Sequence, residues 1–594
     1  MWKPNQFNYN RRPSNTIQLG TLLLGGKNPV RVQSMANTDT NDIPGSVAQC
    51  IRIVEAGGEI VRFTTQGIRE AESIGKIHAA LREQNYTVPL VADIHFNANA
   101  ADVAAQKVEK VRINPGNYVG SIKIGDPSDY TDREFATEYE KVRSRFIPFL
   151  NICKEHGTTI RLGVNHGSLS ERMMNRYGDT SRGMVESCIE FLNICREQNF
   201  DRVVISMKTS NTVMMVQTVR LLVDEMERAD LHFPLHLGVT EAGDGEDGRI
   251  KSSVGIGGLL ADGIGDTIRV SLSEEPEIEI PVGRLLVSYI SERAGHEPIV
   301  ATESPLLSRY EYKRRKTHAV ANIGGENVPV VIAPADGSYA VVPDYILSAD
   351  KVLSLNGESY PLYAVENMEA LPQDAAEIKF LNLKYADLNP EVLGLLKDRT
   401  DIVVLLHTQH ANGVGEQRAF FHAMLNAGST APVILCRDYA ENELQYLQIK
   451  AAADLGVLFI DGFGDGIFLQ NKGTITVEAI NSVAFGILQA SRVRVTKTEF
   501  ISCPSCGRTM FNLQTVVARV KARTSHLTGL KIGIMGCIVN GPGEMADADY
   551  GYVGAGRGKV SLYKKKECLE RNIPEDEAVG KLIDLIKVNG DWHD

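Results

Sequence analysis

The chain has 594 residues, of which 43% are hydrophobic and 23% are charged. A length and composition of this kind are typical of a large globular protein with about three or four domains. The formal net charge is -11 at pH 7, which excludes a general affinity for phosphate backbones or anionic lipid. We therefore expect no nucleic-acid and no membrane partner, and an anionic ligand would need a local cluster of cations.

The sequence predicts a cytoplasmic location. Residues 1–9 do not have the charged and apolar pattern of a leader, and no apolar run long enough to span a membrane occurs in the chain. The nine cysteines are odd in number and scattered, which fits a reducing compartment better than a disulfide framework.

The first 295 residues alternate short β-branched runs with longer amphipathic stretches. Eight such runs occur, and they begin at Val30, Ile60, Pro89, Val111, Thr159, Val203, Leu235 and Thr267. Eight strands alternating with helices over about 250 residues are typical of a (β/α)₈ barrel. We predict a TIM barrel over residues 1–295 that binds the substrate at the C-terminal ends of its strands.

Five cations fall late in these predicted strands, where a closed barrel would gather them around one mouth. Their mutual repulsion would be relieved by an anionic ligand with more than one charge, so we predict a phosphate-rich substrate. The alternative is that these side chains point outward and pair with helix carboxylates. The cations are Arg62, Arg112, Arg161, Lys208 and Arg269, and Asn114, Asn165 and Ser271 near the same strand ends could add neutral hydrogen bonds.

Two carboxylates accompany the cations. Asp93 lies at the end of the third predicted strand beside His95, and Glu241 follows the seventh. Neighbouring arginines keep a carboxylate ionised, so Glu241 could act as an acid or base only if burial counteracts them. The alternative is that Glu241 is a salt-bridge partner of one arginine.

Residues 296–490 contain a second series of strand-like runs, beginning at Val330, Val352, Ile378, Ile402, Val433 and Val457. Residues 459–470 resemble residues 260–271. The glycines and aspartates of the first segment are kept in the second, while Phe468 and Gln470 stand where the first segment has Arg269 and Ser271, the pair expected to hold phosphate. We predict an inserted, degenerate barrel-like α/β domain with a structural role.

The alternative for this insert is a binding module for an electron donor or a regulatory ligand. His407, His410 and His422 are the residues that would favour it.

Residues 491–594 carry a candidate metal site. Cys503 and Cys506 form a Cys-x-x-Cys pair, and Cys537 follows on a glycine-rich loop that leads to Glu544. Three thiols in this pattern can surround an iron–sulfur cluster, whereas a zinc knuckle needs a fourth ligand and buried cysteines need no metal. Cys568 could be that ligand, but its charged surroundings read as a solvated helix face. Spacing leaves iron–sulfur and zinc open.

Seven motifs together resemble the 4-hydroxy-3-methylbut-2-en-1-yl diphosphate synthases, which catalyse the penultimate step of the methylerythritol phosphate route to isoprenoids. They lie at residues 60–63, 91–96, 111–117, 160–169, 237–243, 263–271 and 535–544. The middle domain departs from the shorter members and indicates the long form with an insert.

The resemblance implies a [4Fe-4S] cluster in an α+β domain over residues 491–594, held by Cys503, Cys506, Cys537 and Glu544. It implies reductive ring opening and dehydroxylation of 2-C-methyl-D-erythritol 2,4-cyclodiphosphate to (E)-4-hydroxy-3-methylbut-2-enyl diphosphate. The electrons would come from a ferredoxin or a flavodoxin, with an NADPH-linked reductase left open, and the chain could be a homodimer.

Residue roles also follow from the resemblance. Glu241 would handle a proton on the departing hydroxyl, and Asp93 would be a second carboxylate close to it. Asn540 is expected to reach the substrate when the cluster domain closes on the barrel. The residues implied to bind or adjoin the diphosphate are Arg62, Arg112, Arg161, Lys208, Ser271, Asn114 and Asn165.

A rival interpretation is a radical enzyme that cleaves S-adenosylmethionine. Such enzymes usually need Cys-x₃-Cys-x₂-Cys in one loop near the start of a barrel. The cysteines of this chain are split between two segments and lie near its C-terminal end.

Overall fold

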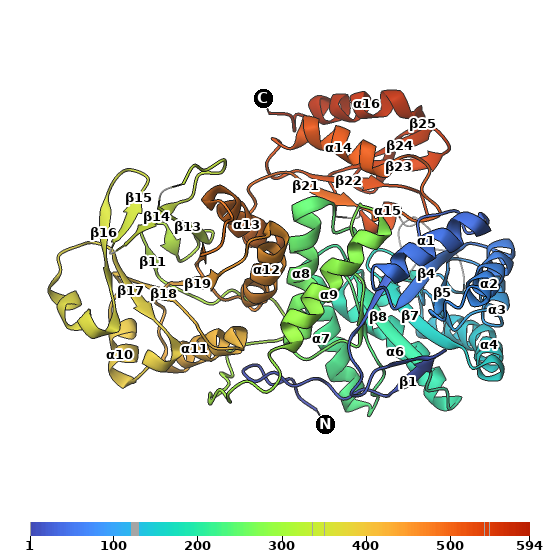
Figure 1. Ribbon diagram of the computed structural model, residues 1–594, viewed down its shortest axis with the longest axis horizontal. Helices are drawn as coiled ribbons and strands as arrows, with labels where there is room; N and C mark the ends of the chain where they lie inside the picture. Colours follow the sequence, from blue (N-terminus) through green and yellow to red (C-terminus); the bar gives the residue numbers. More distant parts are fainter. Residues whose placement is uncertain are drawn as a thin grey trace.

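The computed structural model describes residues 2–119, 130–335, 337–349, 351–539, 541–545 and 547–593 (Figure 1). Its N-terminal part is an eight-stranded parallel sheet, and a bridge between Ile205 and Leu235 joins its two end strands into a barrel. All eight predicted strands are present. They are β3 (Arg31–Met35), β4 (Ile60–Thr65), β5 (Leu90–Ile94), β6 (Lys110–Ile113), β7 (Thr159–Asn165), β8 (Val203–Lys208), β9 (His236–Leu237) and β10 (Thr267–Ile268).

Helices surround this barrel. They are α1 (Ile43–Glu55), α2 (Ile68–Glu83), α3 (Ala98–Ala104), α4 (Asp132–His156), α5 (Glu171–Tyr177), α6 (Ser181–Glu197), α7 (Thr212–Arg228), α8 (Gly245–Ala261) and α9 (Glu279–Ser291). The hairpin of β1 (Ile17–Leu19) and β2 (Leu22–Leu24) buries Leu19 and Leu24 against Ile60 and Val204 at the N-terminal ends of the strands. Because this end is plugged by apolar side chains, polar chemistry is confined to the opposite mouth.

The inserted segment forms a second closed eight-stranded barrel, which confirms the predicted barrel-like fold. Its pairings are parallel except for β14 with β15 and β15 with β16, so two crossovers are replaced by hairpins. Apolar side chains such as Ile332, Phe380 and Phe468 fill it. The strands are β13 (Val330–Pro334), β14 (Tyr345–Ser348), β15 (Lys351–Ser354), β16 (Ser359–Tyr363), β17 (Lys379–Leu383), β18 (Ile402–Leu406), β19 (Val433–Tyr439) and β20 (Gly466–Asn471).

One predicted strand of the insert is wrong. The apolar run at residues 457–460 is the last turn of α12 (Leu444–Ile460), a helix in which nearly every residue from Leu447 onward is buried. A short apolar run cannot be assigned by periodicity when a helix is covered on all sides. The other helices of the insert are α10 (Pro390–Asp398), α11 (Gly413–Ala427) and α13 (Val477–Ala490).

The two barrels meet along α8 and α12, which lie side by side in Figure 1. Four charged side chains, three of them buried, mark the contact. Arg220 of α7 reaches Asp262 and Asp461 at 2.8 Å each, and Arg418 of α11 reaches the same two carboxylates at 2.8 Å each. The two aspartates occupy equivalent positions in the repeat seen in the sequence. The repeat therefore corresponds to a pseudo-symmetric packing of one barrel against the other.

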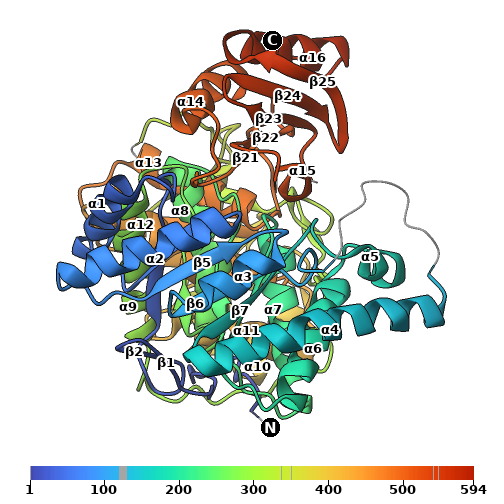
Figure 2. The same cartoon turned by 90° about the vertical axis from the view of Figure 1, so that its right-hand side faces the viewer.

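The C-terminal part is a five-stranded sheet flanked by two long helices, and it lies over the mouth of the first barrel (Figure 2). Lys251 of the barrel pairs with Glu499 at 2.9 Å, and Ser273 donates a hydrogen bond of 2.9 Å to the carbonyl of Cys503. The elements are β21 (Glu499–Ser502), α14 (Leu513–Thr524), β22 (Lys531–Met535), the short α15 (Gly541–Glu544), β23 (Tyr550–Gly556), β24 (Lys559–Lys564), β25 (Glu567–Pro574) and α16 (Glu575–Val588).

Cys568 lies in β25, paired with Tyr563 of β24, so the predicted helix around it is wrong. Charged residues at an edge strand produce the same solvated pattern as an exposed helix face. No helix in the described part of the chain is long and apolar enough to cross a membrane.

Candidate active site

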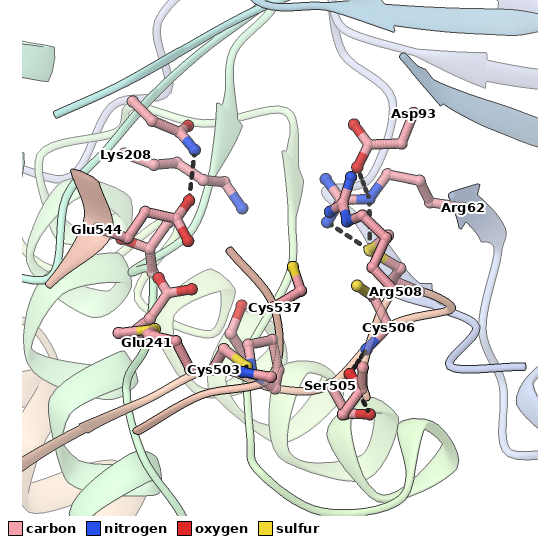
Figure 3. Close-up of a pocket in the computed structure, with 18 of the residues that line it drawn as sticks. Arg62, Asp93, Lys208, Glu241, Cys503, Ser505, Cys506, Arg508, Cys537 and Glu544 are labelled. Carbon is pink, nitrogen blue, oxygen red and sulfur yellow. Dashed lines mark hydrogen bonds and ion pairs between the residues drawn. The ribbon is translucent and has the colours of Figure 1, made fainter. Parts of the chain in front are cut away.

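A cavity lies between the mouth of the first barrel and the C-terminal sheet (Figure 3). Twelve of the fourteen predicted site residues line it. Eight come from the barrel: Arg62, Asp93, Arg112, Arg161, Asn165, Lys208, Glu241 and Ser271. Four come from the C-terminal domain: Cys503, Cys506, Cys537 and Glu544. Residues separated by more than 400 positions in the sequence thus share one site.

The predicted cations point into the barrel and not outward. Arg112 extends along β7, where a Cβ on Gly163 would lie 2.5 Å from its Nε. Lys208 extends past Gly238, where a Cβ would lie 2.6 Å from its Nζ. The missing side chains of these two strand glycines therefore leave the space that the long cationic side chains occupy.

Few carboxylates balance these cations. Asp93 lies 3.2 Å from Arg112 and 3.9 Å from Arg62, and Arg269 is paired with Glu279 at 2.8 Å. Burial alone would raise the pKa of Asp93, but Arg62, His95 and Arg112 hold it well below its ordinary value. Asp93 is therefore ionised and fixes two of the arginines.

Arg161 differs from the other three arginines of the mouth because its guanidinium has no carboxylate within ion-pair distance among the described residues. It is 1% exposed, and among the described residues neither Nε nor Nη1 has a hydrogen-bond partner. Burial and the adjacent Arg62 and Arg112 lower its pKa well below the ordinary value, and burial and Arg161 do the same to Lys208. Such a group is costly to bury alone, so the site is built for an anion that completes it.

Glu241 lies opposite Asp93 across the cavity (Figure 3), so the expectation that the two carboxylates are close is wrong. Its backbone φ is 49°, a strained conformation for a residue other than glycine. Burial, followed by the nearby Glu544, raises the pKa of Glu241 well above its ordinary value. A raised pKa favours the protonated carboxyl, which can donate a proton, and Glu241 has no ion pair among the described residues.

The three thiols come from the loops that follow β21 and β22. Cys503 accepts a hydrogen bond of 3.2 Å from the backbone N–H of Gly536. In the described ranges, no three His, Cys, Asp or Glu side chains converge tightly enough for a single metal ion.

Glu544 is tied to the barrel. Asn165 donates a hydrogen bond of 2.8 Å from Nδ2 to Oε1 of Glu544. Alongside it the backbones of Gly167 and Gly543 touch, since a Cβ on Gly167 would lie 2.2 Å from the Gly543 carbonyl oxygen. The Glu544 segment is therefore held against the mouth of the barrel.

One predicted residue of the described part of the chain, Asn114, is not among those that line the cavity. Asn114 is buried and donates a hydrogen bond of 2.9 Å to Ser168 Oγ, so it supports the loop after β7. Asn540 lies outside the described residues.

Sequence reasoning missed Arg508, which lines the cavity from the C-terminal domain and is 6% exposed. The available signal was its position two residues after Cys506. It also assigned no role to His95, whose pKa burial lowers to about 3 and which contacts Arg112 at 3.1 Å.

Comparison with known proteins identifies both ends of the chain. Residues 14–284 match the GcpE TIM-barrel domain, and residues 499–588 match the GcpE protein C-terminal domain. The chain is 58% identical to a 4-hydroxy-3-methylbut-2-en-1-yl diphosphate synthase (flavodoxin) of Parabacteroides distasonis, with 99% of each chain covered.

Two relatives from other organisms have the same printed name but a lower sequence identity to this chain. The protein of Bacteroides thetaiotaomicron is 55% identical over 98% of each chain. That of Leptospira interrogans is 39% identical, covering 99% of this chain and 98% of its own. These matches confirm the resemblance carried by the seven motifs, and the chain belongs to the 4-hydroxy-3-methylbut-2-en-1-yl diphosphate synthase family, oxidoreductases of isoprenoid biosynthesis.

Proposed function

We propose that this chain converts 2-C-methyl-D-erythritol 2,4-cyclodiphosphate to (E)-4-hydroxy-3-methylbut-2-enyl diphosphate. The reaction opens a C–O bond to the ring phosphate and expels one hydroxyl as water. It takes up two electrons and two protons: one proton leaves in the water, and the other balances the freed phosphate oxygen. The observation that carries the proposal is the buried Arg161 guanidinium, whose Nε and Nη1 have no hydrogen-bond partner in the described part of the chain and which lines the same cavity as three thiols.

The barrel would hold the diphosphate. Arg161 and Lys208 offer their charge to the phosphate oxygens, and Ser271 adds a hydroxyl donor at the eighth strand, where barrels often bind phosphate. Arg62 and Arg112 complete the ring. Asp93 acts on the substrate indirectly, because its ion pairs fix the directions in which Arg62 and Arg112 point.

Glu241 would deliver the proton that leaves with the hydroxyl. Its carboxyl is buried, burial and Glu544 raise its pKa and so favour the protonated form, and Oε2 has no hydrogen-bond partner among the described residues. A carboxylic acid kept neutral by its surroundings is suited to general acid catalysis. The strained backbone at Glu241 would keep this side chain aimed into the cavity.

Cys503, Cys506, Cys537 and Glu544 would hold a [4Fe-4S] cluster. When bound, such a cluster would supply electrons to the substrate one at a time. The donor set fits this group, because a carboxylate oxygen binds iron more weakly than a thiolate and is more easily displaced. A structural zinc knuckle would have no use for such a ligand.

A flavodoxin is the proposed electron donor, since the relatives carry that word in their printed names. We also propose domain limits of 1–295, 296–490 and 491–594, with a structural role for the middle domain. His422 and His407 support that role, because their rings bond internally to Gln6 and Asn382. A homodimer and a cytoplasmic location stay predictions.

The test is anaerobic purification followed by measurement of iron, acid-labile sulfide and zinc, then turnover of the cyclic diphosphate with reduced flavodoxin. About four irons and four sulfides per chain and formation of the linear diphosphate are expected. One zinc per chain without sulfide would contradict the proposal. Turnover that requires S-adenosylmethionine would favour the radical-enzyme alternative.

A further inference from the structure

Arg508 belongs to the C-terminal domain but lines the cavity with the barrel cations. In Figure 3 it lies between Cys506 on one side and the Arg62–Asp93 pair on the other. Among the described residues of the C-terminal domain, it is the one lysine or arginine that lines this cavity. Its position therefore differs from that of every cation the barrel provides.

Arg508 lies among groups that can carry negative charge, the thiols of Cys506 and Cys537 and the carboxylate of Asp93, with Arg62 also nearby. Its guanidinium is almost fully buried. Even so, Nε and Nη1 have no hydrogen-bond partner among the described residues. Two free donors on a buried cation indicate that a group is still to be bound there.

The backbone beside Arg508 is fixed against the barrel. A Cβ on Gly507 would lie 2.6 Å from the carbonyl oxygen of Thr38, in the loop after β3. On the other side, Thr509 Oγ1 accepts a hydrogen bond of 3.1 Å from the backbone N–H of Cys506. The short segment from Cys506 to Thr509 is thus held in place, and Arg508 points from it into the cavity.

We propose that Arg508 is a positioning residue that links the diphosphate site to the redox centre, with its guanidinium shared between the thiolate ligands and a phosphate oxygen. This inference rests on the proposed function. A cation beside the thiolates stabilises the reduced, more negative state of a cluster and so raises its reduction potential. Its N–H groups without a partner would bind the same diphosphate that the barrel cations hold.

The test uses the cluster-loaded full-length chain, with the midpoint potential measured by redox titration followed by electron paramagnetic resonance. Arg508→Gln is expected to have a more negative potential than wild type. Arg508→Lys keeps the charge, so its midpoint potential should be close to that of the wild type. The matched control is Arg161→Gln, since the largest influences on Arg161 are its burial and the charges of barrel residues, first Arg62 and Arg112.

Inorganic pyrophosphate serves as the probe for the anion, with binding measured by calorimetry. Arg508→Gln should weaken pyrophosphate binding roughly tenfold, as expected for loss of one charge-assisted contact. Arg508→Lys should weaken it less. Arg161→Gln should also weaken it, but with the potential unchanged.

The inference is overturned if Arg508→Gln keeps its iron and shows the wild-type potential. It is also overturned if Arg161→Gln lowers the potential equally, because the effect would then be one of net charge. Should Arg508→Gln lose its iron, unchanged pyrophosphate affinity in the metal-free chain would reject the shared guanidinium. Absence of an iron–sulfur cluster from the wild type would instead contradict the proposed function.

Discussion

Asn165 of β7 and Glu544 of the C-terminal domain are 379 residues apart in sequence and joined by a hydrogen bond of 2.8 Å. The bond connects the barrel mouth to the carboxylate that we assign to the cluster. A neutral donor to a ligand fixes the orientation of that ligand without adding charge.

Replacing Asn165 by Ala should therefore loosen Glu544 while leaving the three thiols in place. We expect normal iron content but a kcat reduced about tenfold or more, in the range found for partners that orient metal ligands. Asn165→Asp is the stricter variant, because two facing carboxylates would repel. Iron analysis and steady-state kinetics check this, and a wild-type kcat in both variants would contradict it.

The cluster should depend on its thiols more than on its carboxylate. Cys→Ser at position 503, 506 or 537 should remove most of the iron and abolish activity, since a serine hydroxyl is a poor substitute for a thiolate. Glu544→Ala should keep part of the cluster and turn over slowly. Cys568→Ser is the control and should behave as wild type, because Cys568 lies in β25 on the far edge of the sheet. Full activity in any of the first three serine variants would reject the site.

Phe468 tests the structural role of the insert. Its side chain is 2% exposed and packs in the core of the second barrel, at the position equivalent to Arg269 in the first. Phe468→Ala should lower the free energy of unfolding by about 3–5 kcal/mol. Phe468→Leu should lower the free energy of unfolding by less than Phe468→Ala. Kinetic constants per folded molecule should not change, and a specific loss of kcat with intact folding would point to a catalytic role for the insert.

The ion pair between Lys251 and Glu499 should make domain docking sensitive to acid. Burial opposes ionisation of Glu499, but Lys251 and Arg492 outweigh it and lower its pKa from 4.5 to about 2. Below pH 4.5 the unfolded chain binds a proton that the folded chain does not. The stabilisation is therefore complete above pH 4.5 and is lost as the pH falls toward 2.

The variant that isolates this effect is Glu499→Gln. It should be less stable than wild type near pH 6, on the order of 1–3 kcal/mol, and the difference should shrink toward pH 3. Urea unfolding of both chains at each pH gives the difference directly. A difference that does not vary with pH would mean that Glu499 acts through packing and not through its charge.

Much of this architecture could be predicted because barrel strands have strong local signals. The eight runs from Val30 to Thr267 are β-branched and bounded by breaks, so their number and order were correct. The assignment of residues 457–460 as a strand was wrong, because a helix that is buried on every side has no polar face and so shows no helical period in its sequence.

The site was predictable where residues from different strands had to converge, and less so where the two domains meet. Arg508 and the Asn165–Glu544 bond depend on how the C-terminal domain lies on the barrel, which no local pattern determines. Asn114 illustrates the opposite error. It follows a strand end, but its side chain turns to Ser168 and supports a loop.

Arg112 provides the final test, because the structure gives each of its nitrogen atoms a distinct environment. Nη1 donates a hydrogen bond of 3.2 Å to Asp93, and Nη2 donates one of 2.9 Å to the carbonyl oxygen of Gly163. Nε has no hydrogen-bond partner among the described residues. Arg112→Lys keeps the charge but cannot make this set of contacts. We expect it to weaken pyrophosphate binding and substrate turnover by about 1–3 kcal/mol.

Arg112→Ala should be worse than Arg112→Lys, because it also leaves Asp93 with one fewer cation. Pyrophosphate should inhibit the wild type competitively and inhibit Arg112→Ala much less. The control is Arg202→Ala, which removes an arginine that binds the carbonyl of Gln18 near the plugged end of the barrel, and pyrophosphate should inhibit it as it does the wild type. If Arg112→Ala shows unchanged kinetics and unchanged inhibition, the diphosphate does not bind at this ring of cations, and the barrel mouth has another ligand.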